Sequence, residues 1–147
     1  MFTGAFIQST SLLDGTNFEQ STIFITEYNT TGAAGFVVNK LFGRTLNQLE
    51  EFKHCPAFQL YEGGPVDQEH LFFIHQRPDI ITGGTLVANK IYVGGDFKQA
   101  VTHINNNTLN SVDIKLFIGY CGWDSTELDA EIAEGSWVVL GDGEVFF

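Results

Sequence analysis

The sequence predicts an α+β fold with a mostly antiparallel, coiled β-sheet. Segments rich in β-branched and aromatic residues dominate the chain, and the clearest pair is joined by a short polar loop, as in a β-hairpin. Three amphipathic segments with helical spacing lie among them, and strands and helices do not alternate regularly. This order argues against a doubly wound parallel sheet. With 147 residues and no linker, residues 1–147 have the size of one domain.

The strands are expected where short apolar runs are bounded by turn residues. Residues 21–28 and 35–39 form the clearest hairpin, because both are rich in β-formers and the polar loop between them contains glycine. The remaining strands are expected at residues 4–8, 58–61, 70–76, 85–93, 113–120, 137–140 and 145–147.

Each of the first two predicted helices has an N-cap followed by an apolar stripe. The first spans residues 46–52 and begins after Thr45, whose hydroxyl is suited to cap exposed amides. The second begins at Asp96, and its apolar residues recur at helical spacing. That stripe consists of Phe97, Ala100, Val101 and Ile104.

The third helix is expected to follow a buried strand and a tight glycine turn at residues 119–123. Asp124 is the predicted N-cap, and Glu127 is placed to bond back to it in a variant of the capping box. Gly135 then ends the helix.

The charge of the chain excludes one large class of function. The net charge is −11, and the seven Lys and Arg residues are scattered, with no two adjacent. Direct nucleic-acid binding requires clustered cations that displace counterions from phosphates. From residue 116 to the end there are seven acids and no Lys or Arg. We therefore expect no direct DNA binding and, if a partner exists, a basic one.

The chain also lacks the signals of a membrane, secreted or metal-binding protein. No apolar run approaches the ~20 residues of a membrane span, and the first residues lack the basic charges that open a signal peptide. We expect a cytoplasmic protein whose two cysteines, Cys55 and Cys121, are reduced, free and inert. Neither lies in a C-x-x-C motif, so no zinc site, other metal or cofactor is predicted.

Several short motifs, in this order and spacing, resemble the AlgH/YqgE family of bacterial proteins. They are Phe18, Ser21, Glu27, Gly32-Ala33, Gly35-Phe-Val-Val-Asn-Lys40, Gly63-Gly64-Pro65-Val66, Phe73-Ile74-His75, Gly94-Gly95-Asp96, and Gly119-Tyr120-x-Gly122-Trp123 with Leu128, Glu131 and Trp137. The resemblance implies strongly bent sheets that form a partly barrel-like core, with about three helices packed outside. The family's usual label is transcriptional regulator, and no catalytic residue set is established for it.

Glu27, Glu62 and His75 form the one combination suited to acid/base chemistry. Glu27 shares a strand face with isoleucines, so burial is expected to raise its pKa, and a buried His near a carboxylate is a workable general base. The alternative is that His75 is a hydrogen-bonded core residue, which is the commoner case.

Three further groups are candidate binding residues. Gly63, Gly64 and Pro65 suit either an anion-binding backbone nest or a tight turn, and we favour the turn. Tyr120 and Trp123 suit a pocket or interface, but for Trp123 we favour a hydrophobic anchor that packs over the start of the third helix. The last group, Glu127, Glu131 and Glu134, lies on one helix face. That face is either a solubilising surface or a docking site for a basic partner.

Two functions from different classes follow. The first is a non-enzymatic regulatory or protein-interaction module that does not bind DNA directly. The alternative is a small-molecule-binding protein or hydrolase-like enzyme using Glu27, Glu62 and His75. A deep pocket containing all three side chains would favour the alternative.

Overall fold

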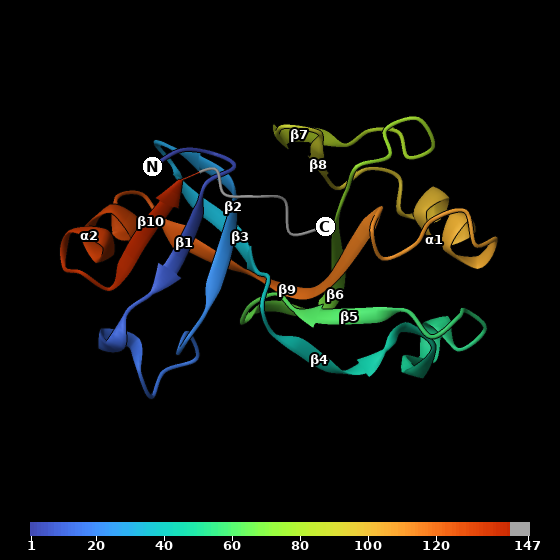
Figure 1. The fold of residues 1–147 in the computed structure, drawn as a ribbon, viewed down its shortest axis with the longest axis horizontal. Coiled ribbons are helices and arrows are strands. Elements are labelled where there is room, and N and C mark those ends of the chain that lie inside the picture. The colour runs from blue at the N-terminus through green and yellow to red at the C-terminus, as the bar shows by residue number, and fades with distance from the viewer. Residues whose placement is uncertain (142–147) are drawn as a thin grey trace.

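The long strand β9 (Ile114–Asp124) organises the fold and crosses the molecule in Figure 1. The computed structural model describes residues 1–141. β9 pairs antiparallel with β3 and β6 and parallel with β5, which unites ten strands in one sheet. The predicted α+β fold with a mostly antiparallel sheet is confirmed. The sheet runs from β10 to β7 without closing on itself, so it is not a barrel.

A first lobe contains both ends of the described chain. Its strands lie in the order β10-β1-β2-β3 and continue into the C-terminal half of β9, and helix α2 packs on one face. Two tryptophans and three isoleucines fill the core beneath that helix. The elements are β1 (Phe6–Ser9), β2 (Thr22–Asn29), β3 (Gly32–Val37), α2 (Glu127–Ala133) and β10 (Trp137–Gly141).

A second lobe is built on the N-terminal half of β9. There β6, β8 and β7 continue the sheet on one side, and β5 and β4 lie on the other. Helix α1 covers the apolar side chains of this half. The elements are β4 (Leu41–Thr45), β5 (Gln59–Glu62), β6 (Val66–His75), β7 (Thr85–Ala88), β8 (Ile91–Val93) and α1 (Phe97–Asn105).

Glycines allow the chain to cross β9 where the two lobes meet. A Cβ on Gly63 would lie 2.3 Å from the Gly119 carbonyl oxygen, and a Cβ on Gly119 would lie 2.3 Å from the Gly64 oxygen. Gly119 also has a φ of +72°, which L-residues rarely adopt. Gly63 and Gly64 therefore let the chain pass close to the backbone of β9, and Gly119 allows β9 to bend at that point.

The predicted glycine turn after residue 119 is wrong, because β9 continues through it to Asp124. Asp124 is consequently the last residue of the strand, and Thr126 is the N-cap of α2. The expected reach-back contact does form, since the Asp124 amide donates to Glu127 Oε1 at 3.1 Å. Pairing with β3 gives residues 121–124 of β9 backbone hydrogen-bond partners, and this pairing overrides the local turn signal.

The predicted helix at residues 46–52 is also wrong, so the described residues contain two α-helices rather than three. Two 3₁₀ turns, Leu46–Gln48 and Glu50–Phe52, stand in its place, separated by extended backbone at Leu49. Thr45 is the predicted N-cap, and its amide donates to Gln48 Oε1 at 2.9 Å in a capping box. The bond from Thr45 to Gln48 closes the first turn locally, and the extended Leu49 prevents the two turns from joining into one helix.

The other differences concern strand boundaries. The predicted strand at 85–93 is a hairpin of β7 and β8, because Lys90 turns the chain with a φ of +63°. β4 was not predicted, and β6 begins four residues earlier than expected. Asp96 is confirmed as the N-cap of α1 through a 3.1 Å bond from the Gln99 amide. The strand predicted at 145–147 lies outside the described residues.

Candidate functional site

The three acid/base candidates lie in different settings. Glu27 is exposed on β2, so the prediction that it is buried is wrong. Glu62 is exposed at the end of β5 and lines a polar hollow of about 260 Å³ beside Lys40 and Pro65. His75 alone is buried, with no exposed surface, at the end of β6. The structure therefore does not gather the three into one pocket.

His75 is a core residue with both ring nitrogens occupied. Nε2 lies 3.1 Å from the Gly94 carbonyl oxygen, and Nδ1 accepts a 3.1 Å bond from the Arg77 amide. Because the carbonyl can only accept and the amide only donate, the proton resides on Nε2. Burial lowers the pKa of His75, which favours the neutral ring that this bonding pattern requires. The ring also stacks on Tyr92, at 5.6 Å between centroids.

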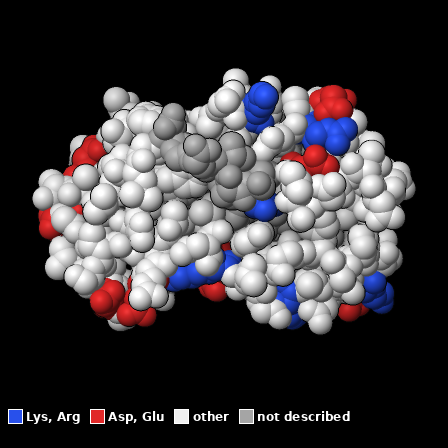
Figure 2. Space-filling model, in the orientation of Figure 1, with Lys and Arg blue, Asp and Glu red and all other residues white. Residues whose placement is uncertain are grey.

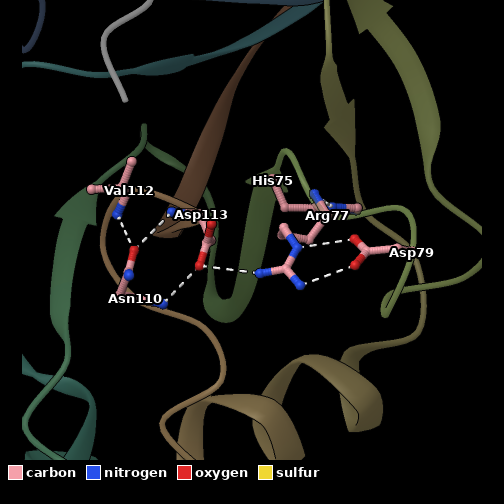
Figure 3. Close-up of polar contacts among 6 residues, drawn as sticks. All are labelled: His75, Arg77, Asp79, Asn110, Val112 and Asp113. Atoms are coloured by element: carbon pink, nitrogen blue, oxygen red, sulfur yellow. Dashed lines mark hydrogen bonds and ion pairs between the residues drawn. The ribbon is translucent and has the colours of Figure 1, made fainter.

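A polar clamp that sequence reasoning missed lies beside His75 (Figure 3). Arg77 donates from Nε and one terminal nitrogen to the two Asp79 oxygens, both at 2.9 Å, and lies 3.5 Å from Asp113. Asp113 in turn accepts from the Asn110 amide. The clamp joins the loop after β6 to the turn before β9, two segments far apart in sequence. It holds the two loops together, and its carboxylates are already bonded to Arg77 and the Asn110 backbone amide.

The Gly63-Gly64-Pro65 segment is a crossing rather than an anion nest. The Gly63 amide already donates to the Ile118 oxygen at 2.8 Å, so it is unavailable to a ligand. The Gly63 oxygen accepts from the Val37 amide and, at 3.4 Å, from the Cys121 thiol. Gly64 is buried, and Pro65 is exposed at the rim of the polar hollow.

Trp123 is a buried anchor of the first lobe, as the alternative interpretation predicted. Its indole nitrogen donates to Glu131 Oε1 at 3.1 Å, and the Trp137 nitrogen donates to the same oxygen at 2.9 Å. Both tryptophans are nearly inaccessible, at 7% and 2% exposure of the residue. Glu131 thus points toward the core, whereas Glu127 caps the Asp124 amide and Glu134 remains exposed. The predicted acidic helix face therefore does not present three equivalent carboxylates.

Tyr120 marks a groove where the two lobes meet, which we call the waist groove. It comprises two hollows of about 410 and 540 Å³ that share Glu27, Ala34 and Tyr120. The Tyr120 ring packs edge-on against Phe72 at 5.3 Å between centroids and forms an aromatic wall. Among the described residues that line the groove, the charged ones are all acids: Glu27, Asp67 and Asp124.

The floor of the waist groove is open because its residues are small. Across the β3–β9 ladder, Gly32 faces Asp124 and Ala34 faces Gly122, while Glu27 faces Ala34 from β2. Directly opposed residues, and residues two apart on one strand, share a sheet face. Glu27 and Asp124 therefore flank a floor that carries no side chain larger than a methyl group. Sequence reasoning singled out Glu27 and Tyr120 but not Asp67, and it assigned Asp124 to a helix cap.

The described residues contain no group of three His, Cys, Asp or Glu side chains placed to hold a metal ion. Cys55 and Cys121 are both free and buried, and burial raises the pKa of the Cys121 thiol to about 12. Among residues 1–141, no helix has the length and apolarity needed to cross a membrane.

Comparison with known proteins identifies the family. The AlgH-like family model matches residues 6–146. The chain belongs to the AlgH-like family. A UPF0301 protein of Cytophaga hutchinsonii is 34% identical, covering 92% of this chain and 75% of its own length. A UPF0301 protein of Bacteroides thetaiotaomicron is 32% identical, covering 92% of this chain and 69% of its own length.

Solved structures show the same fold. The AlgH protein of Pseudomonas aeruginosa matches 95% of this chain and 77% of its own, with a TM-score of 0.72 at 22% identity. A protein of Corynebacterium diphtheriae matches with a TM-score of 0.72 at 23% identity, covering 95% and 75% of the two chains. These likenesses establish architecture, not activity.

Proposed function

We propose that this AlgH-like protein is a non-enzymatic, cytoplasmic interaction module, regulatory in role, whose first lobe binds a basic protein partner. One observation carries the proposal. Residues 1–37 and 119–141, which form the first lobe, contain eight Asp and Glu residues and no Lys, Arg or His. In Figure 2 the left end of the molecule accordingly shows red patches and no blue. A predominantly negative field of this kind steers a cationic partner and raises its association rate.

The distribution of cations supports the absence of direct DNA binding. All seven Lys and Arg residues fall between positions 40 and 115. Several are engaged within the protein: Arg77 binds two aspartates, Lys53 lies 3.4 Å from Glu50, and the Lys115 ammonium donates to the Ser111 oxygen. A surface that neutralises phosphates would need these cations free and adjacent. Micromolar, salt-sensitive binding to random duplex DNA in a mobility-shift assay would contradict this part of the proposal.

The enzymatic alternative has no comparable support. Its one buried member, His75, uses both ring nitrogens in backbone contacts, and its two carboxylates are exposed. A general base needs a free nitrogen within reach of the proton that it removes.

The proposal is tested by neutralising equal numbers of exposed acids on the two lobes. The first-lobe variant carries Glu19→Gln, Glu27→Gln and Glu134→Gln, and the matched second-lobe control carries Glu50→Gln, Glu51→Gln and Glu69→Gln. Each is used to recover partners from the native organism at low and moderate salt, followed by mass spectrometry. We expect the first-lobe variant alone to lose a basic partner. Equal recovery with both variants would overturn the proposal.

A further inference from the structure

We infer that the waist groove is the place where the basic partner docks, and that its occupant is an extended segment of that partner carrying two cationic side chains about four residues apart. The inference rests on the proposed function and adds a location and a binding mode to it. The observations behind it are the charge, the shape and the spacing of the groove.

The charge of the groove has a single sign. None of its lining residues is Lys, Arg or His, and its three carboxylates belong to exposed residues. Asp67 is partly compensated because His70 lies outside the groove with Nδ1 at 2.6 Å from its Oδ1. Among the described residues, the Glu27 carboxylate has only the neutral side-chain amide of Asn29 as a hydrogen-bond partner, at 3.1 Å, and no cation pairs with it. Glu27 and Asp124 are therefore the carboxylates that attract a cation.

The shape of the groove suits an extended chain rather than a compact side-chain cluster. The floor of Gly32, Ala34 and Gly122 leaves room for another backbone to approach the sheet surface. At one end, Tyr120 and Phe72 offer aromatic surface to the aliphatic stem or the charged head of a Lys or Arg side chain. A groove with apolar walls and acidic edges complements a segment of the opposite charge.

The spacing between the two carboxylates follows from the register of β2, β3 and β9. Glu27 and Asp124 lie on the two strands that flank β3, and their partners on β3 are Ala34 and Gly32, two residues apart. With ~4.8 Å between strands and ~3.3 Å per residue, the two Cα atoms are about 12 Å apart. An extended peptide places residues i and i+4 about 13 Å apart on the same side. Two cations at this spacing reach both carboxylates at once.

The test is a titration of the ¹⁵N-labelled full chain, followed by NMR, with the blocked peptide acetyl-Arg-Ala-Ala-Ala-Arg-amide. The control peptide has glutamine in place of both arginines. We expect the largest shift changes at the amides of Gly32, Ala34 and Gly122, and none with the control peptide. Glu27→Gln with Asp124→Asn should weaken binding by about twofold to thirtyfold, the range for two exposed ion pairs. The matched pair Glu50→Gln with Glu69→Gln should leave it unchanged.

The outcomes separate this inference from the proposed function. Shift changes elsewhere on the first lobe, for example around Glu19 and Glu134, would show that the peptide does not bind in the groove. The proposal that the acidic lobe is the binding surface would still stand. Equal changes over both lobes would overturn both. Spermidine is titrated in parallel: if it binds in the groove and the peptide does not, the occupant is a small amine and the inference is wrong.

Discussion

Removing the Glu131 carboxylate tests the link between the two tryptophans and the stability of the first lobe. Glu131→Ala leaves the indole N–H groups of Trp123 and Trp137 without their shared acceptor, in residues only 7% and 2% exposed. An unsatisfied buried donor costs about 1–3 kcal/mol. Because Glu131 itself is half-buried, water can enter the space that it leaves, so we expect a total loss of about 2–4 kcal/mol.

Glu131→Gln separates the geometry of this contact from its charge. The amide oxygen can still accept from both indoles, but a neutral acceptor binds about half as strongly, so the expected loss is about 1–2 kcal/mol. Glu134→Ala is the matched control, because that side chain is exposed on the same helix end and should change stability by less than about 0.5 kcal/mol.

The assay is equilibrium urea unfolding monitored by tryptophan fluorescence, which reports on the two rings concerned. The predicted order of stability is wild type, Glu134→Ala, Glu131→Gln and then Glu131→Ala. If Glu131→Ala unfolds at the same free energy as Glu134→Ala, the shared acceptor does not stabilise the lobe and the reasoning is refuted.

Three other predictions concern the crossing, a histidine and a thiol. Gly119→Ala should destabilise by more than about 3 kcal/mol, since its Cβ would meet a backbone oxygen at 2.3 Å, whereas Gly43→Ala, with nothing within 4 Å, should be near neutral in the same urea assay. The hydrogen bond to Asp67 raises the pKa of His70 above 6.5, so the pair stabilises the fold below that pH and loses its effect as pH rises through the folded pKa. NMR titration should show this shift, and Asp67→Asn should remove most of it, because Glu69 and Glu51 raise the pKa by smaller amounts. Cys121, with a pKa of about 12, should resist iodoacetamide at pH 8 in the native protein and react after unfolding; modification without unfolding would contradict its burial.

Local signals in the sequence were sufficient where they agreed with the tertiary environment. Asp96 capped α1 as predicted, and the hairpin of β2 and β3 formed where β-rich runs flank a short loop. The predictions failed where pairing with a distant strand overrode a local pattern. Gly119 and Gly122 are typical turn residues, yet both lie inside β9 because that strand pairs with segments far away in sequence.

The candidate site was harder to predict because its residues come from separate strands. Glu27, Tyr120 and Asp124 meet only through the register of β2, β3 and β9, which no local pattern specifies. Conversely, Glu131 looked like one of a row of surface acids, and only the fold shows that it accepts from two buried indoles. The Gly-Ala-Ala-Gly run of β3 was the one available signal, since small residues within a strand indicate close approach by another group.

The most direct test of the acidic interaction surface is site-specific photo-crosslinking in living cells. A photoreactive amino acid replaces Thr31, which is exposed at the waist groove, or Val112, which is 62% exposed in the second lobe. We predict that the Thr31 position yields a discrete adduct whose partner peptide is basic, and that Glu27→Gln with Asp124→Asn removes it. Adducts of equal yield from both positions, or an adduct at Thr31 that survives loss of both carboxylates, would contradict the account.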